Sequence, residues 1–127
     1  MKLEKLNIQG IEDIYLISNV KKEFAKAVSE EWKENPPWER YHKKLAIDLA
    51  VLDQEKERAI DLPHFEKLSG EDDLYSIRHP EASKNIRVIY GFVDEYIILL
   101  TAFIENNDGD YKRAISVAKL RLRWLKS

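Results

Sequence analysis

Arg78 and Arg87 are the two side chains whose types and spacing in this sequence could do chemistry. They lie in DLYSIRHPEASKNIRVIYGFV, residues 73–93, which reads as two short strands joined by a tight loop. Each arginine stands at the loop end of its strand, so the two guanidinium groups should face each other across the hairpin. Like charges in facing positions repel. A bound anion would turn that repulsion into attraction.

The register of this hairpin follows from the face that must meet the helices. Side chains alternate between the two faces of a strand, and the apolar face is the one that packs. The predicted core face consists of Tyr75, Ile77, Val88, Tyr90 and Phe92. Arg78 and Arg87 should then emerge together on the opposite face, in a register that pairs one with the other.

A pair of arginines on an open sheet face suits a phosphate. Guanidinium groups bind phosphate oxygens through two parallel hydrogen bonds. Side chains that could assist in the loop or near the same rim are His79, Lys84, His64, Lys67, Lys112 and Tyr111. The alternative is structural, because an arginine near a strand end often pairs with a carboxylate. The carboxylates available for such pairing are Glu81, Glu105 and Asp108.

The surrounding elements must hold this hairpin in place. In chain order we expect strands over residues 3–9 and 12–17, helices within 20–35 and 38–60, a connection over 59–73, the hairpin, a strand over 95–105 and a helix over 110–126. Pro36-Pro37 separates the two helices, which we expect to lie antiparallel. Ser18 or Asn19 can cap the first helix, and Asp108 or Asp110 the last. The apolar strand suits burial on both faces, so it belongs at the centre of the sheet.

These elements predict a single α+β domain over residues 1–127, with helices on one face of a small, mainly antiparallel sheet. The chain has no cysteine, which excludes disulfides and thiolate chemistry. No apolar run approaches the ~20 residues of a membrane span. The first residues lack the apolar core of a signal peptide, so we expect a cytoplasmic protein.

Charge is unevenly distributed along the chain. Residues 1–73 hold 12 Lys and Arg against 17 Asp and Glu, and residues 74–127 hold 9 against 6, so balances of −5 and +3 give the formal net charge of −2. The C-terminal half is therefore where an anion should bind. The polar stripe of the final helix consists of Lys112, Ser116, Lys119, Arg123 and Lys126. Such a stripe can dock on RNA or simply face solvent.

Motifs in the second half of the chain resemble a known family. The order LYSIR, NIRVIYGF, YIILLTAFIE and YKRAISVAKLRLRWL, within residues 66–127, is similar to the RelE/HigB-like toxin superfamily and its phage-derived HigB-like branch. The resemblance implies a RelE-like α+β fold: a small twisted, mainly antiparallel sheet with two N-terminal helices on one face and a C-terminal helix. It also implies the toxin of a type II toxin-antitoxin system, kept inactive by a cognate antitoxin protein.

The activity that this resemblance implies is ribosome-dependent cleavage of mRNA. It uses the 2'-hydroxyl of the RNA as nucleophile and needs no metal or other cofactor. Arg87 would stabilise the phosphate and Arg78 would support binding, whereas the general acid is open among His64, His79 and Tyr111. The expected RNA contacts are Lys67, Lys84, Lys112, Lys119 and Arg123.

One segment departs from the family pattern and keeps other functions open. Relatives often carry Lys or Arg after the buried strand, where this chain has Glu105-Asn106-Asn107. The alternative function is a non-catalytic binding protein on the RelE/ParE fold, such as a gyrase-type poison, or an inactive phage-derived relative. A plain interaction module that uses the sheet edge or the closing helix is a third hypothesis. The three histidines lack the spacing of a helical metal pair, and there is no glycine-rich phosphate loop.

Overall fold

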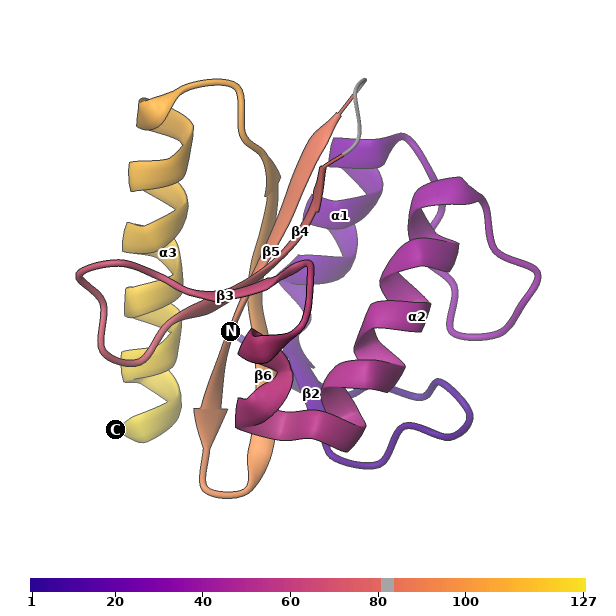
Figure 1. Ribbon diagram of the computed structural model, residues 1–127, viewed down its shortest axis with the longest axis horizontal. Coiled ribbons are helices and arrows are strands. Elements are labelled where there is room, and N and C mark those ends of the chain that lie inside the picture. The colour runs from indigo at the N-terminus through magenta and orange to yellow at the C-terminus, as the bar shows by residue number, and fades with distance from the viewer. Residues whose placement is uncertain (81–83) are drawn as a thin grey trace.

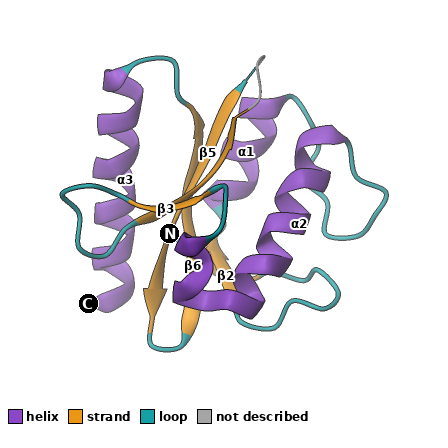
Figure 2. Cartoon of the chain, viewed as in Figure 1, coloured by secondary structure: helices purple, strands orange, loops and turns teal. Residues whose placement is uncertain are grey.

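The computed structural model describes residues 1–80 and 84–127, apart from the side chains of His79 and Pro80. In chain order its elements are β1 (Leu3–Lys5), β2 (Ile14–Ile17), α1 (Asn19–Val28), α2 (Arg40–Glu55), the short helix η1 (Lys56–Asp61), β3 (Phe65–Lys67), β4 (Tyr75–Pro80), β5 (Asn85–Val93), β6 (Tyr96–Ile104) and α3 (Asp108–Lys126). Figure 2 shows these strands between the helices.

The strands form one mixed, mostly antiparallel sheet in the order β1-β2-β6-β5-β4-β3. Among the strands of the described residues, only β2 and β6 pair in parallel. The predicted α+β class is therefore confirmed, and so is the central position of β6. The predicted connection over residues 59–73 is wrong in part, because Phe65–Lys67 pairs with β4 as an edge strand. A strand of three residues is too short to show a periodic pattern.

The helices cover both faces of the sheet. Figure 1 shows α1 and α2 on one side of the strands and α3 on the other. The expectation that all helices share one face is therefore wrong. The physical reason is that β6 buries every side chain from Ile97 to Ala102, so both of its faces need a cover. At Gly91 of β5 a Cβ would lie 3.2 Å from the backbone oxygen of Asp73, closer than ordinary contact, and 3.6 Å from a methyl group of Leu122 on α3, which is ordinary contact.

The apolar stripes of the helices form the core as the sequence predicts. In α1 the buried residues are Val20, Phe24 and Val28. The apolar residues of α2 that the core buries include Tyr41, Leu45, Leu49 and Leu52. The helix α1 ends earlier than expected, because Ser29 adopts a left-handed conformation with φ of 59°. Residues 30–39 therefore form a loop rather than further helical turns.

The final helix is capped by Asn107 rather than by Asp108 or Asp110. Asn107 accepts a hydrogen bond from the backbone N–H of Asp110 at 3.0 Å. Asp110 in turn accepts from the backbone N–H of Asn106 at 3.0 Å. These two hydrogen bonds give partners to the N–H of Asp110 in the first turn and to the N–H of Asn106 just before the helix. The prediction of Asp108 or Asp110 as the cap is thus corrected to Asn107. None of the helices in the described part of the chain is long and apolar enough to cross a membrane.

Candidate functional site

The predicted pairing of Arg78 with Arg87 is confirmed by the register of β4 and β5. Directly opposed residues of an antiparallel pair lie on the same face. Their environments differ, however: Arg78 is exposed, whereas Arg87 is only 7% exposed. The predicted open face is wrong at Arg87, because α3 covers it there. The Arg87 guanidinium lies over the Tyr111 ring, 5.1 Å from its centre.

Two carboxylates hold Arg87, from Glu66 of β3 and from Glu105, which directly follows β6. Its Nε donates to Oε1 of Glu105 at 2.8 Å. Its Nη1 donates to Oε1 of Glu66 and, at 3.1 Å, to the hydroxyl of Ser76. Together with Tyr111 these residues form what we call the Arg87 cluster. It joins β3, β4, β5, the end of β6 and α3, so a long-range set of contacts fixes the guanidinium.

The Arg87 cluster carries more negative than positive charge. Burial opposes the charge on Arg87, but the hydrogen bonds that it donates to the carboxylates of Glu105 and Glu66 outweigh this effect and raise the pKa of the guanidinium. Two carboxylates and one guanidinium leave a formal charge of −1. Arg87 therefore pairs with carboxylates, which was the alternative to phosphate binding. Glu105 is one of the partners expected for such pairing. Its Nη2 atom has no hydrogen-bond partner within the described residues, so Nη2 is the nitrogen of the guanidinium that remains to donate to a ligand.

Tyr111 is the member of the Arg87 cluster with a transferable proton. Burial raises the pKa of its hydroxyl, the Arg87 charge lowers it, and the nearby Glu66, Glu105 and Glu71 raise it further. The net direction is upward. Tyr111 thus keeps its proton at neutral pH and can act as a donor rather than a base.

His64 belongs to a different surface from Tyr111. Its carbonyl accepts a hydrogen bond from the N–H of Arg78 at 2.7 Å, so the two residues are neighbours on adjacent strands. Its ring turns toward α2, where Nδ1 lies 3.4 Å from a carboxylate oxygen of Asp48. A hollow of about 390 Å³ is lined by Pro63, His64, Phe65, Glu66 and Arg78. Of the candidate acids, Tyr111 adjoins Arg87 and His64 adjoins Arg78. The His79 side chain lies outside the described residues.

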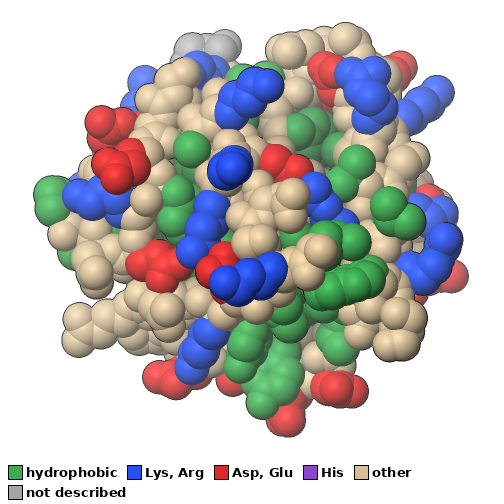
Figure 3. Space-filling model, turned by 180° about the vertical axis from the view of Figure 1, so that it is seen from behind, with side chains coloured by type: hydrophobic (Ala, Val, Ile, Leu, Met, Phe, Trp, Pro, Cys, Tyr) green, Lys and Arg blue, Asp and Glu red, His purple; other side chains and the backbone are tan. Residues whose placement is uncertain are grey.

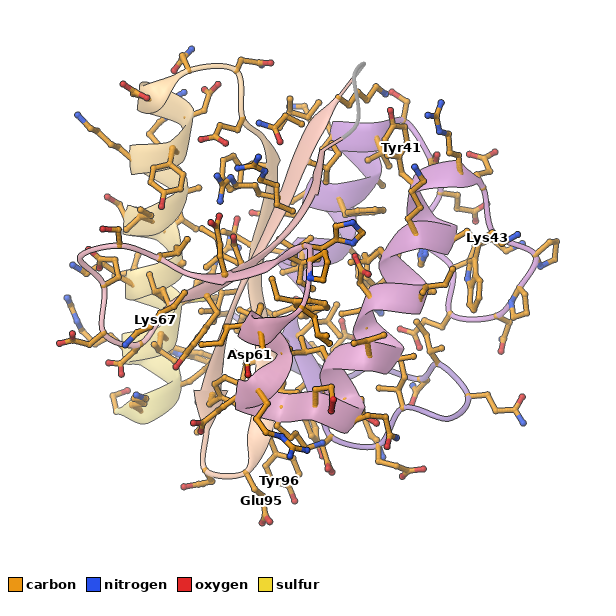
Figure 4. All side chains as sticks on the ribbon, viewed as in Figure 1. Tyr41, Lys43, Asp61, Lys67, Glu95 and Tyr96 are labelled. Atoms are coloured by element: carbon orange, nitrogen blue, oxygen red, sulfur yellow. The ribbon has the colours of Figure 1, made fainter. Side chains whose placement is uncertain are left out.

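The predicted RNA-binding cations do not gather on one face. Lys84 donates to the carbonyl of Val28 at 2.9 Å and lies over the Tyr41 ring. Lys119 pairs with Glu71 at 3.2 Å, at a hollow that Arg123 also lines. Lys67 and Lys112 are exposed. Figure 4 shows Lys67 at the end of β3 and Tyr41 at the start of α2, well apart from each other.

Glu66 is the functional candidate that sequence reasoning missed. It lies in the segment predicted as a connection, where an acidic residue indicates only a solvated loop. Its proximity to Arg87 arises because β3 pairs with β4 and brings Glu66 opposite Ser76. Phe65-Glu66-Lys67-Leu68 does not alternate between apolar and polar residues, so no local signal marks that strand.

Comparisons with known proteins add no family or function. No protein-family model, curated protein or solved structure matches this chain. Within the described part of the chain, no three His, Cys, Asp or Glu side chains gather closely enough to hold a metal ion. The site must therefore be interpreted from its own geometry.

Proposed function

We propose that this protein is the toxin of a type II toxin-antitoxin system and cleaves mRNA on the ribosome. The observation that carries the proposal is the Arg87 cluster beside an exposed Arg78 in the opposed position. It brings a carboxylate, a hydroxyl donor and two guanidinium groups to one region of the sheet. Cleavage of RNA by its own 2'-hydroxyl needs these three kinds of group. The cognate antitoxin and a cytoplasmic location are part of the same proposal.

The chemistry assigns one task to each side chain. Glu66, whose side chain is 44% exposed, takes the proton of the 2'-hydroxyl as that oxygen attacks phosphorus. Arg78 and the Nη2 atom of Arg87 stabilise the charge that develops on the phosphate oxygens. Tyr111 gives its proton to the departing 5'-oxygen. The products are a 2',3'-cyclic phosphate and a free 5'-hydroxyl, and no metal is required.

A second candidate function is favoured by a separate observation. Glu105 occupies Nε of Arg87 and leaves the cluster with a formal charge of −1, which opposes a phosphate. The following Asn106-Asn107 is neutral where relatives of the resembled family carry cations. A protein on this scaffold that binds a partner without cleaving RNA would retain the Arg87 cluster for stability alone.

The deciding experiment is inducible expression in a bacterial host with mapping of mRNA 5'-ends. The variants are Arg78→Ala, which removes an exposed side chain, and the matched control Arg58→Ala, whose side chain is 79% exposed on η1. We expect growth arrest and mRNA cleavage from the parent and from Arg58→Ala, and neither from Arg78→Ala. Healthy growth and intact mRNA with folded parent protein would favour the binding function instead.

A further inference from the structure

Three consecutive carboxylates lie in the connection between β3 and β4. They belong to Glu71, Asp72 and Asp73, and we call this segment the acidic loop. In Figure 1 the connection crosses α3, and two ion pairs join them: Glu71 with Lys119 at 3.2 Å and Asp73 with Lys126 at 4.0 Å. Between the acidic loop and α3 is a hollow of about 330 Å³, lined by residues 70–74, Lys119, Leu122, Arg123 and Lys126.

The backbone of the acidic loop is fixed at both ends. The N–H of Leu68 donates to the carbonyl of Leu74 at 3.0 Å, and the N–H of Glu71 donates to the carbonyl of Leu68 at 3.2 Å. Leu68 and Leu74 are only 2% and 1% exposed, so the core anchors the segment on either side. Gly70 makes the turn with φ of 78°, a conformation that favours glycine. The three carboxylates are therefore held beside α3.

The surface that the acidic loop faces is the polar stripe of α3. Lys119, Arg123 and Lys126 are exposed and follow one another at about one helical turn, or ~5.4 Å. A row of cations at this spacing can contact successive phosphates of a nucleic-acid strand. Three carboxylates against three cations leave this surface with no formal charge. Figure 3 shows the face turned away in Figure 1, where Lys and Arg side chains are likewise interspersed with Asp and Glu.

The ion pairs of the acidic loop matter more for binding than for folding. Exposed pairs contribute little to the free energy of unfolding, and the side chains of Lys119 and Lys126 are 53% and 46% exposed. A phosphate that approaches these cations, in contrast, meets carboxylates that cannot leave with the solvent ions. It must compete with them for Lys119 and Lys126, and Asp72 repels it at the same hollow.

We propose that the acidic loop is an autoinhibitory element, which lowers the affinity of α3 for single-stranded RNA by acting as a built-in counter-ion of Lys119, Arg123 and Lys126. Removal of its charges exposes the polar stripe of α3 as a phosphate-binding row. RNA is taken as the ligand from the proposed function. Binding is therefore measured off the ribosome, on RNA that cannot be cleaved, so that the autoinhibition and the nuclease activity can each fail without the other.

The test is fluorescence anisotropy with a labelled 2'-O-methyl RNA of about 20 nucleotides, which lacks the nucleophilic hydroxyl. The variant combines Glu71→Gln, Asp72→Asn and Asp73→Asn, and it changes the formal net charge from −2 to +1. We expect its Kd to be about tenfold lower than that of the parent at 0.1 M salt. The plot of log K against log salt should become steeper by about 2, because each of three freed cations adds about 0.7 for a single strand.

The matched control makes the same change in net charge elsewhere. It combines Glu12→Gln, Glu31→Gln and Glu39→Gln, at exposed carboxylates in the loops between β1 and β2 and between α1 and α2. Its Kd should fall by no more than about twofold. Equal affinities of the two triple variants would overturn the proposal, because net charge alone would then explain the gain.

Two further variants locate the effect on α3. Addition of Lys119→Gln and Arg123→Gln to the loop variant should abolish its gain in affinity, since these cations receive the RNA. Asp72→Asn alone breaks no ion pair among the described residues and should lower the Kd about twofold, which keeps the test decisive if the triple variant does not fold. The proposal is overturned if a folded loop variant binds no more tightly than the parent, or if the gain survives the loss of Lys119 and Arg123.

Discussion

Glu23 of α1 and Arg121 of α3 form an ion pair at 2.8 Å that joins helices from opposite faces of the sheet. The pair lies at the edge of β6, beyond the point where β2 ends. Arg121 also donates to the carbonyl of Leu100 at 2.7 Å, and Glu23 accepts from the hydroxyl of Thr101 at 3.0 Å. Side-chain charges thus take the place of a missing strand along part of this edge.

Removal of one partner of this pair should destabilise the fold. Arg121→Met leaves the Glu23 carboxylate with an unpaired charge in a half-buried position, and we expect a loss of about 2–3 kcal/mol in the free energy of unfolding. Urea denaturation followed by circular dichroism measures the change. The control is Arg123→Met, an exposed site on the same helix, which should change stability by less than about 0.5 kcal/mol. Equal effects of the two substitutions would contradict a structural role for the pair.

Asp53 should be a second determinant of stability. Its buried carboxylate accepts hydrogen bonds from the backbone N–H groups of Glu12 and Asp13 at 3.0 and 2.9 Å, which fixes the loop before β2 onto α2. Asp53→Ala leaves both donors without a partner, and we expect a cost of about 2 kcal/mol. Thermal unfolding should show a lower Tm than for the parent. An unchanged Tm would show that water replaces the carboxylate without cost.

Folding stability should decrease with acid because of His42. This buried ring accepts a hydrogen bond at Nε2 from the N–H of Lys33 at 3.0 Å and lies among Trp32 and Trp38, and burial lowers its pKa below the ordinary 6.5. The unfolded chain therefore binds a proton more readily than the native state. The contribution of neutral His42 to the free energy of unfolding is complete above pH 6.5. It is lost as the pH falls toward the lowered pKa of the native state.

The measurement is the free energy of unfolding between pH 8 and pH 5 for the parent and for His42→Gln. The amide oxygen of Gln can accept the same N–H without titrating. The difference between the two proteins should change by at most about 1.4 kcal/mol per pH unit, with the parent losing stability more steeply. Parallel curves would show that His42 does not titrate between the two states.

Glu66 and Glu105 should have opposite effects on the proposed activity. Glu66→Gln removes the base, so cleavage of mRNA in cells should fall by at least about 10²-fold. Glu105→Gln keeps an acceptor for Arg87 Nε but removes one negative charge, so cleavage should rise by about fivefold, in line with roughly 1 kcal/mol between nearby charges in water. Mapping of mRNA 5'-ends after matched induction checks both. Full activity of Glu66→Gln would exclude it as the base.

The sequence by itself determined the α+β class, the apolar stripes of the helices and the pairing of Arg78 with Arg87. Each of these depends on local periodicity, since neighbouring strands joined by a short loop have few registers that bury one face. The central place of β6 likewise follows from its nearly continuous run of apolar residues.

Only the tertiary structure decided the environment of Arg87. Its partners Glu66 and Glu105 lie 21 and 18 residues away along the chain, and a three-residue edge strand positions one of them. The chain has 23 acidic residues, so charge alone does not select a partner at such separations. The face of the sheet on which α3 packs was also decided by the tertiary structure. Both faces of β6 are apolar, so α3 must cover the face that α1 and α2 leave open.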